Sequence, residues 1–130
     1  AFYYMDMARM FAPKTYAKDP KAITVPIVVE TTTLEDLTKN PRATNEVMWA
    51  QIMSDLEKAE KYLANYKRAD KYTPDLSVVY GLKARAYLTM ENWAKAEEYA
   101  KKAQAGYTML NEEQFLSRTS LYAVSLQTTL

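Results

Sequence analysis

The side chains that most often carry out catalysis are missing from this sequence. Its 130 residues include no histidine and no cysteine, so it lacks the commonest general base, the commonest metal ligand and every thiol. Carboxylate pairs, lysine chemistry and oxygen-ligated metals remain. Glu35 and Asp36 are adjacent and would point apart on a helix, which makes them a poor acid–base pair. Glu112 and Glu113 fit better as first-turn residues of a helix.

Oxygen ligands for a metal ion are also sparse. Asp70, Asp75 and Glu91 are expected near loops, but no ligand-rich loop pattern surrounds them. The chain also has no glycine-rich phosphate loop. We therefore expect a protein that is not an enzyme and that uses no cofactor and no metal.

Tyrosine is the abundant side chain with binding chemistry, at 11 residues. A sugar ring stacks on an exposed aromatic face that is flanked by hydrogen-bonding groups. Tyr16, Tyr66, Tyr72 and Tyr107 are expected in connections between helices, and they are the candidates for such a contact. The alternative is that these rings pack on the scaffold and expose only their hydroxyl groups. The sequence leaves the ligand-binding residues unassigned.

The composition narrows the class of protein. Glycine occurs only twice, while alanine, lysine, glutamate and leucine are common, which favours helix over sheet. The net charge is +1 with lysine and glutamate interspersed, whereas nucleic-acid binders carry a basic patch, so we expect no nucleic-acid partner. No apolar run reaches the length of a membrane-spanning helix. The chain starts at Ala1, inside an apolar aromatic run, and we expect it to be a segment of a longer protein.

Apolar spacing predicts helices over residues 2–12, 45–66 and 112–116, a short helical turn over 34–37, and two antiparallel helices within 73–106. The first helix is apolar on most sides and is expected to be buried. Thr44 or Asn45 caps the helix that follows the turn, and Glu57 and Lys61 are spaced for an ion pair on it.

Capping signals define the pair of helices within residues 73–106. Thr73 is expected to cap its first helix, with Pro74 at the first helical position and Asp75 in the first turn. Asn92 caps the second helix, and Gly106 stands where a left-handed residue would end it. Exposed ion pairs are expected at Glu97–Lys101 and Glu98–Lys102.

The connections are less regular. Pro13 ends the first helix, and Pro26 interrupts the β-branched run over residues 23–29. That run is therefore expected as a short edge strand or a strapped-down extended segment. Residues 117–130 show no clear period and are expected as an irregular tail, either a loop or a strand whose partners lie elsewhere.

An internal repeat is the most specific feature of the sequence. Trp93, Ala96 and Ala103 match Trp49, Ile52 and Ala59 at an offset of 44 residues, and Ala84 and Tyr87 match Ala8 and Phe11 at an offset of 76. The first helix pair thus carries 32 more residues between its helices, which form the insertion over residues 13–44. Small and aromatic residues at these spacings are typical of tetratricopeptide repeats. Both tryptophans are then core residues; the alternative is a generic four-helix domain with coincidental spacing.

Several stretches carry a resemblance to a known family. They are residues 3–11 (YYMDMARMF), 23–27 (ITVPI), 41–47 (PRATNEV), 51–59 (QIMSDLEKA), 81–88 (GLKARAYL) and 92–96 (NWAKA), ending at Gly106 and Tyr107. Together they resemble the repeat scaffold of the SusD/RagB family of outer-membrane glycan-binding lipoproteins. The resemblance covers residues 2–116, and the tail after Ser117 does not match the family's pattern.

This resemblance implies an all-α fold of tetratricopeptide-like antiparallel helix pairs, an α-α superhelix, with a scaffold over 1–116 and an irregular tail over 117–130. It implies a non-catalytic protein that captures an oligosaccharide or other nutrient at the surface of the outer membrane. The partner would be a SusC-like TonB-dependent transporter, and a lipidated cysteine upstream of this segment would anchor the full-length protein. No ligand-binding residue of the family corresponds to a position here.

A different class of function remains open. Tetratricopeptide repeats also form free-standing modules that grip a partner peptide in a concave groove. Such modules usually have uninterrupted repeats, and the insertion over residues 13–44 speaks against this alternative.

Overall fold

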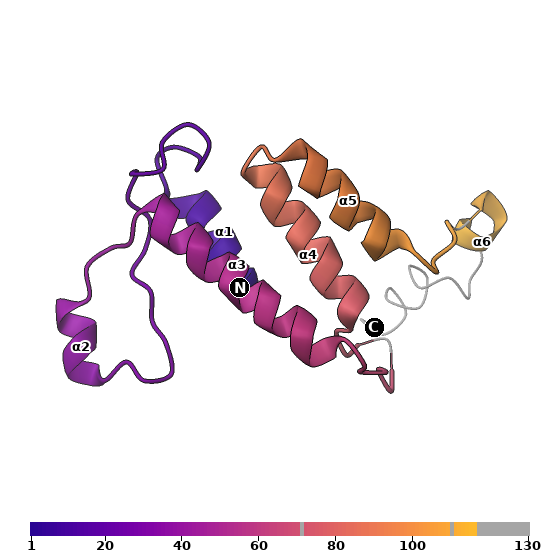
Figure 1. Cartoon of the computed structure of the whole chain (residues 1–130), viewed down its shortest axis with the longest axis horizontal. Helices are drawn as coiled ribbons and strands as arrows, with labels where there is room; N and C mark the ends of the chain where they lie inside the picture. The colour runs from indigo at the N-terminus through magenta and orange to yellow at the C-terminus, as the bar shows by residue number, and fades with distance from the viewer. Residues whose placement is uncertain (71, 110, 117–130) are drawn as a thin grey trace.

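The chain folds into helices joined by loops (Figure 1). The structure is a computed structural model and describes residues 1–70, 72–109 and 111–116. Its helices are α1 (Phe2–Phe11), α2 (Leu34–Lys39), α3 (Asn45–Leu63), α4 (Leu76–Thr89), α5 (Trp93–Gln104) and α6 (Glu112–Leu116). The described residues contain no strand, only an isolated antiparallel bridge between Ile23 and Thr44. The prediction of an all-α fold is confirmed; the tail expected over 117–130 lies outside the described residues.

The helices form two successive pairs. α3 packs against α1 and against α4, and α4 packs against α5. Figure 1 shows α3, α4 and α5 side by side, with α2 and α6 at opposite ends. The first pair, α1 with α3, is interrupted by the loop that carries α2, and the second pair, α4 with α5, is joined by a tight turn. This is the tetratricopeptide-like architecture that the repeat predicts.

The core lies where α1, α3 and α4 meet. Its buried side chains are Met5 and Ala8 of α1, Met48, Trp49, Ile52 and Leu56 of α3, and Val79 and Ala86 of α4. The α3 residues recur at three and four positions, as an amphipathic helix requires. The helix that apolar spacing predicts over residues 45–66 is therefore confirmed, and it ends at Leu63.

Tyrosine rings close the α4–α5 pair. Tyr99 of α5 stacks on Tyr87 with 5.5 Å between ring centroids and lies 5.9 Å from Tyr80. The ammonium of Lys83 sits 5.0 Å from the Tyr99 ring centroid and also pairs with Glu60 of α3. One buried lysine thus ties together three helices.

The turn between α4 and α5 ends one helix and begins the next. Asn92 N donates to Tyr87 O and Glu91 N to Leu88 O, so the turn is a Schellman motif. Glu91 occupies its left-handed position at φ 59°, although it is not glycine. The Asn92 side chain then accepts from Lys95 N, which confirms it as the cap of α5. Gly106, at φ 85°, is left-handed as predicted.

The start of α4 corrects one prediction. Asp75 caps the helix, since its carboxylate accepts hydrogen bonds from the backbone N–H groups of Ser77 and Val78. The expectation that Thr73 is the cap, followed by helical Pro74, was wrong. The carboxylate of Asp70 binds both the backbone N–H and the hydroxyl of Thr73, which holds that residue in a turn before the helix.

Two further predictions, both in the first helix pair, were wrong: the full burial of α1 and an ion pair on α3. α1 is buried on one face only: Met5 and Ala8 are buried, whereas Tyr3 and Met10 are 79% and 74% exposed. The ion pair expected between Glu57 and Lys61 is absent from the described residues. By contrast, both exposed ion pairs predicted on α5 are present. The distance from lysine Nζ to glutamate Oε1 is 2.5 Å in Glu97–Lys101 and 2.6 Å in Glu98–Lys102. Of the two caps considered for α3, Thr44 is the one whose side chain binds Val47 N.

Residues 23–29 form an extended segment that is held down, one of the two forms predicted for them; it is bonded to the end of the insertion and to α1. Thr24 N donates to Ala43 O at 2.7 Å, and Ala43 N to Val25 O at 3.1 Å. The hydroxyl of Tyr4 in α1 accepts from Val28 N at 2.7 Å and donates to Val28 O at 2.6 Å, so one side chain imitates a strand partner. α2 lies in the same loop and has a capping box formed by Thr33 and Asp36.

Tyr4→Phe should therefore loosen the insertion without unfolding the scaffold. The variant removes two hydrogen bonds, each of which is worth about 0.5–1.5 kcal/mol. Hydrogen exchange should rise for the amides of residues 27–33 and stay unchanged in α3 and α4. Tyr3→Phe is the matched control, because the neighbouring tyrosine has a largely exposed side chain. Equal exchange in both variants would contradict the role given to the Tyr4 hydroxyl.

Candidate functional site

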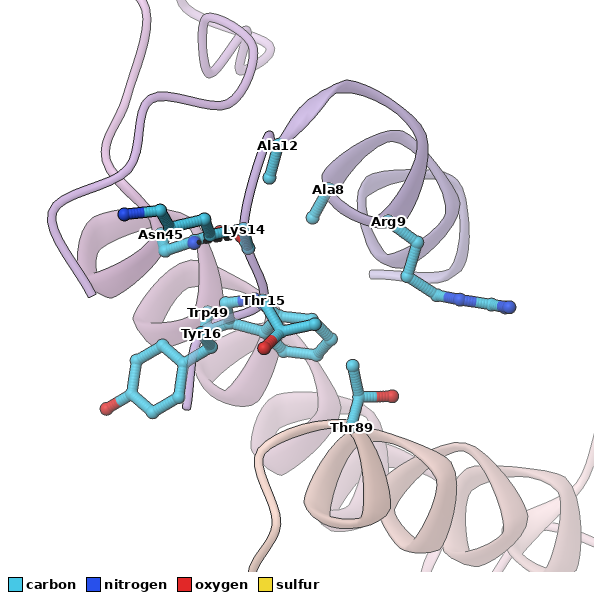
Figure 2. A pocket seen from close by; sticks show the side chains of 9 residues that line it. All are labelled: Ala8, Arg9, Ala12, Lys14, Thr15, Tyr16, Asn45, Trp49 and Thr89. Atoms are coloured by element: carbon cyan, nitrogen blue, oxygen red, sulfur yellow. Dashed lines mark hydrogen bonds between the residues drawn. The ribbon is translucent and has the colours of Figure 1, made fainter. Parts of the chain in front are cut away.

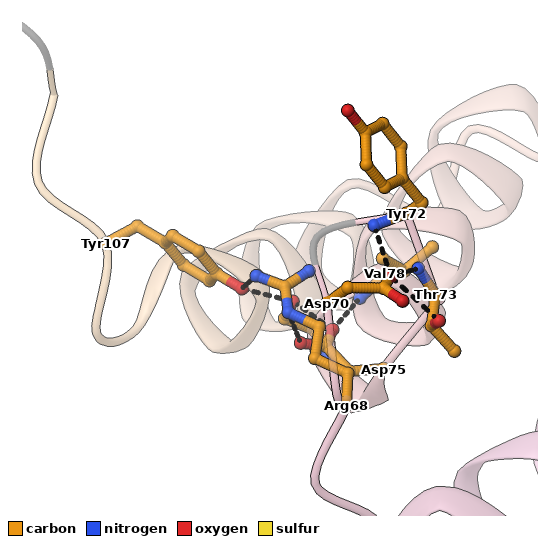
Figure 3. A network of polar contacts seen from close by, with 8 residues as sticks. Arg68, Asp70, Tyr72, Thr73, Asp75, Val78 and Tyr107 are labelled. Carbon is orange, nitrogen blue, oxygen red and sulfur yellow. Dashed lines mark hydrogen bonds and ion pairs between the residues drawn. The ribbon is translucent and has the colours of Figure 1, made fainter. Parts of the chain in front are cut away.

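The four candidate tyrosines do not form one site. Tyr16 lies in the loop after α1 and lines a hollow beside α3. Tyr66 and Tyr72 follow α3, and they are 44% and 94% exposed. Tyr107 follows α5 and is half exposed. Figure 3 shows Tyr107 in a polar network and the Tyr72 ring pointing away from that network.

The polar network joins the connection after α3 to the segment after α5. Arg68 Nε pairs with the Asp75 carboxylate at 3.2 Å, and Arg68 Nη2 donates to the Tyr107 hydroxyl at 3.2 Å. The same hydroxyl lies 2.9 Å from Ser77 Oγ. Figure 3 shows Arg68, Asp75 and the Tyr107 hydroxyl converging, with Asp75 at the start of α4. Each of them is satisfied by another member, so the network works as a structural joint.

The electrostatics of the joint centre on Asp75. The hydrogen bond from the Ser77 hydroxyl, followed by backbone N–H groups and the nearby Arg68, lowers the pKa of Asp75 below its ordinary value despite partial desolvation. A lowered pKa means that the folded state favours the carboxylate. The stability from this group is therefore complete above the unfolded pKa of 3.8 and is lost as the pH falls through the folded value.

Asp75→Ala should lower the free energy of unfolding at pH 7 by about 1–2 kcal/mol, because it removes a helix cap. Urea unfolding should show this difference shrinking below pH 4, as the wild-type carboxylate is protonated. Asp75→Asn should keep most of the stability at pH 7, since asparagine caps helices well. A difference between wild type and Asp75→Ala that stays constant from pH 7 to pH 2.5 would contradict this account.

The hollow beside Tyr16 is the better candidate for a ligand site (Figure 2). It has a volume of about 170 Å³ and lies where α1, the following loop, α3 and the end of α4 meet. Its lining residues are Ala8, Arg9, Ala12, Lys14, Thr15, Tyr16, Asn45, Trp49 and Thr89. In Figure 2 the guanidinium of Arg9 extends away from the Asn45 and Trp49 side chains. The inner wall is thus formed by an amide, an indole ring and small side chains.

Asn45 is the polar group of this wall. It is 1% exposed, and its Nδ2 donates to Lys14 O at 2.9 Å and to Asp19 O at 3.0 Å. Its Oδ1 is buried and has no hydrogen-bond partner among the described residues. A buried acceptor without a partner is costly, so a donor from water or a hydroxylated ligand is favoured there. Sequence reasoning considered this residue only as a helix cap, because its partners lie 26 and 31 residues away.

Two of the carboxylates considered for metal binding, Asp70 and Asp75, lie near Arg68 before α4 (Figure 3). The described residues hold no group of three histidine, cysteine, aspartate or glutamate side chains placed to bind a metal ion. Asp70 and Asp75 each cap a turn or helix through hydrogen bonds to nearby N–H groups. In the same described part of the chain, no helix has the length and apolar character needed to cross a bilayer.

The second helix pair has a hollow that sequence reasoning missed. It is an open groove of about 490 Å³ between α4 and α5, lined by Ala84, Arg85, Leu88, Trp93, Ala96, Glu97 and Ala100. Trp93 is 60% exposed, so its placement in the core was wrong, whereas Trp49 at 3% exposed was placed correctly. The reason is cover: α4 packs over α3, and no described helix packs over α5 on the Trp93 side.

Comparison with known proteins gives matches among solved structures only. No protein-family model matches the chain, and none of the curated proteins does. A SusD-like carbohydrate-binding protein from Bacteroides vulgatus is 29% identical, with a TM-score of 0.77 over 88% of this chain and 24% of its own. Two SusD superfamily proteins, from Bacteroides vulgatus and Bacteroides thetaiotaomicron, are both 21% identical.

These two superpose with TM-scores of 0.76 and 0.72, cover 94% and 90% of this chain, and show the shared fold. The chain spans 24–28% of the length of the three structures. The chain is thus similar to SusD-like proteins over this segment, which confirms the resemblance seen in its sequence.

Proposed function

From this SusD-like fold, we propose that the chain is part of a non-catalytic protein that binds glycans for uptake. The observation that carries the proposal is the 29% identity over 88% of the chain with a SusD-like carbohydrate-binding protein. The absence of histidine and cysteine from the sequence agrees with binding and gives no support to catalysis. The helix pairs supply a rigid scaffold, which is how repeat proteins present binding surfaces.

The cellular setting belongs to the same proposal. The protein would act at the surface of the outer membrane and hand its ligand to a TonB-dependent transporter. The sequence resemblance supports this setting, as does the bacterial origin of the similar structures. The test is co-purification of an affinity-tagged protein with the transporter from its native host. Protease treatment of intact cells should also degrade the tagged protein if it is exposed at the surface.

Within the described residues, we propose the hollow beside Tyr16 as the place where this segment touches a sugar. Three features support it: an aromatic ring at the wall, a buried amide acceptor without a partner, and a volume of about 170 Å³. A sugar hydroxyl is a donor that would satisfy Asn45 Oδ1, and aromatic rings suit the apolar face of a pyranose. The fully paired network around Tyr107 offers no such unmet group.

Isothermal titration against a panel of neutral and acidic oligosaccharides tests two things: whether the segment binds a glycan, and whether the glycan binds at the hollow beside Tyr16. Binding of any glycan supports glycan recognition by the segment. Tyr16→Ala should then weaken that binding at least about tenfold, equivalent to 1.4 kcal/mol. Tyr72→Ala is the matched control, because Tyr72 is 94% exposed. Binding that survives Tyr16→Ala unchanged places the sugar elsewhere, while no binding by the segment or by the longer protein contradicts glycan recognition.

A further inference from the structure

The hollow beside Tyr16 is small for a sugar site. Its volume is about 170 Å³, whereas pockets that enclose a drug-sized ligand have volumes of about 300–1,000 Å³. Tyr16 lines the hollow but is only partly buried, so a sugar ring can stay at this tyrosine, at the edge of the hollow. The part of the sugar that enters is then one substituent of the ring, and the chemistry of the inner wall decides which substituent fits.

Most of the inner wall is apolar. Ala8 and Trp49 are each 3% exposed, and Ala12 lines the hollow with them. Figure 2 shows the two alanines of this wall above the Trp49 ring. A hydroxyl group that is buried against such surfaces gives up its hydrogen bonds to water without replacement, which is costly. A methyl group loses nothing there and gains from burial.

Asn45 is the polar exception, and it can only accept a hydrogen bond. Both N–H bonds of its amide are already used, on Lys14 O at 2.9 Å and Asp19 O at 3.0 Å. Its Oδ1 is buried and has no partner among the described residues. The matching ligand group is therefore a donor. An amide N–H is a donor only, whereas a hydroxyl also carries lone pairs that need donors, which alanine side chains do not supply.

The charged residues of the lining do not call for a charged ligand. Arg9 lies 3.8 Å from a carboxylate oxygen of Asp6, and Lys14 lies 3.6 Å from one of Asp19. The Arg9 and Lys14 side chains are 52% and 63% exposed, so both cations remain largely in water. Exposed ion pairs contribute at most about 1 kcal/mol. A sugar carboxylate would therefore gain little at this hollow, and an uncharged substituent is favoured.

We propose that the hollow beside Tyr16 recognises the acetamido group of an N-acetylated sugar. The N–H group donates to Asn45 Oδ1, and the methyl group packs against Ala8 and Ala12. The carbonyl oxygen of the group stays toward the opening, where water can donate to it, and the sugar ring lies at Tyr16. This inference rests on the proposed glycan binding and narrows its substrate class to amino sugars that carry an acetyl group.

Sugars that differ only in the substituent at C2 provide the test. Isothermal titration of the 130-residue chain compares N-acetylated chitotriose with cellotriose, and the methyl glycoside of N-acetylgalactosamine with that of galactose. At least one acetamido sugar should bind at least about tenfold more tightly than its partner, which is 1.4 kcal/mol. In saturation-transfer NMR, the acetyl methyl protons of that sugar should receive the strongest saturation, because the methyl group is the part that enters the hollow.

The contrary results separate the two proposals. Equal affinity within both pairs would overturn acetamido recognition and leave glycan binding standing. Tighter binding of a glucuronic acid glycoside than of every acetamido sugar would overturn it in favour of an acidic ligand. Failure of every sugar to bind would remove acetamido recognition together with the proposed glycan binding.

Two alanines provide matched variants that locate the contact. Ala12 lines the hollow, whereas Ala17 is exposed in the following loop and does not line it. Ala12→Leu fills the hollow and should weaken binding of the acetamido sugar at least about tenfold, while Ala17→Leu should leave it unchanged. Equal effects of the two variants would overturn the placement of the acetyl group. The comparison of matched sugars uses the wild-type chain and does not depend on either variant.

Discussion

Replacing Trp49 with alanine is expected to lower the free energy of unfolding by about 3–5 kcal/mol, the usual cost of deleting a buried tryptophan. Replacing Trp93 with alanine is expected to cost less than about 1 kcal/mol, as for other exposed positions. The two residues occupy the same place in successive repeats, yet they are 3% and 60% exposed. The difference between the variants therefore measures the burial that α1, the insertion and α4 give to Trp49 and that Trp93 lacks.

The larger cost at Trp49 follows from its neighbours. It packs in the core cluster with Met48, Ile52 and Val79, where truncation leaves a cavity that a packed interior fills only in part. Urea denaturation of wild type and both variants at pH 7 gives the comparison. Similar losses for Trp49→Ala and Trp93→Ala would mean that both tryptophans are equally covered, which contradicts the structure.

Lys83→Ala is expected to lower the free energy of unfolding by about 2–3 kcal/mol. Removing one partner of a fully buried ion pair typically costs 3–5 kcal/mol. The loss should be smaller here, because the Glu60 side chain is 29% exposed while that of Lys83 is 3% exposed. Lys83→Met should cost less than Lys83→Ala, since its chain still fills the space between α3 and Tyr99. Lys101→Ala is the control, because it breaks an exposed pair worth at most about 1 kcal/mol.

The same lysine makes the stability depend on alkaline pH. Desolvation acts to lower the pKa of Lys83, but the hydrogen bond and charge of Glu60, together with Tyr99, outweigh it and raise the pKa above 10.5. A raised pKa means that this contribution is complete below pH 10.5 and is lost as the pH rises through the folded value. The difference in stability between wild type and Lys83→Met should therefore narrow above pH 10.5. A difference that grows with pH would contradict the pairing with Glu60.

Sequence periodicity predicted the helices and their pairing because these depend on local spacing. The stripe of α3, the Asn92 cap and the left-handed Gly106 are each specified by residues within one or two turns. The two repeat offsets, which differ by 32 residues, also predicted the insertion over residues 13–44. The second helix pair has only the tight turn at Glu91 in its place. Predicting these features required no information about contacts between residues that are distant in the sequence.

Features that depend on distant neighbours were not predictable in this way. The repeat placed Trp93 in the core by analogy with Trp49, but burial depends on neighbouring elements, and within the described residues these bury Trp49 and leave Trp93 60% exposed. The hydrogen bonds between Tyr4 and Val28 join residues 24 positions apart, and the Lys83–Glu60 ion pair joins residues 23 positions apart. Thr73 was predicted to cap α4 because threonine is a common capping residue. Its backbone N–H and hydroxyl instead bind the carboxylate of Asp70.

The candidate site shows the same division. Tyr16 was predicted as one of four possible sugar contacts, and the structure places it alone among them at the hollow beside Trp49. The unpaired oxygen of Asn45 carries no signal in the sequence, because only the folded loop over residues 14–19 captures its amide nitrogen. The candidate sugar contact therefore combines side chains of the insertion with side chains of the first helix pair.

Acrylamide quenching of two single-tryptophan variants is the most direct test of the repeat as the structure shows it. Trp49 and Trp93 occupy the same place in successive repeats, but only Trp49 is buried. Trp49→Phe leaves Trp93 as the reporter of the groove between α4 and α5, and Trp93→Phe leaves Trp49 as the reporter of the core. The structure predicts strong quenching of Trp93 and weak quenching of Trp49, since their exposed fractions are 60% and 3%. Equal quenching of the two tryptophans in folded protein would contradict the account.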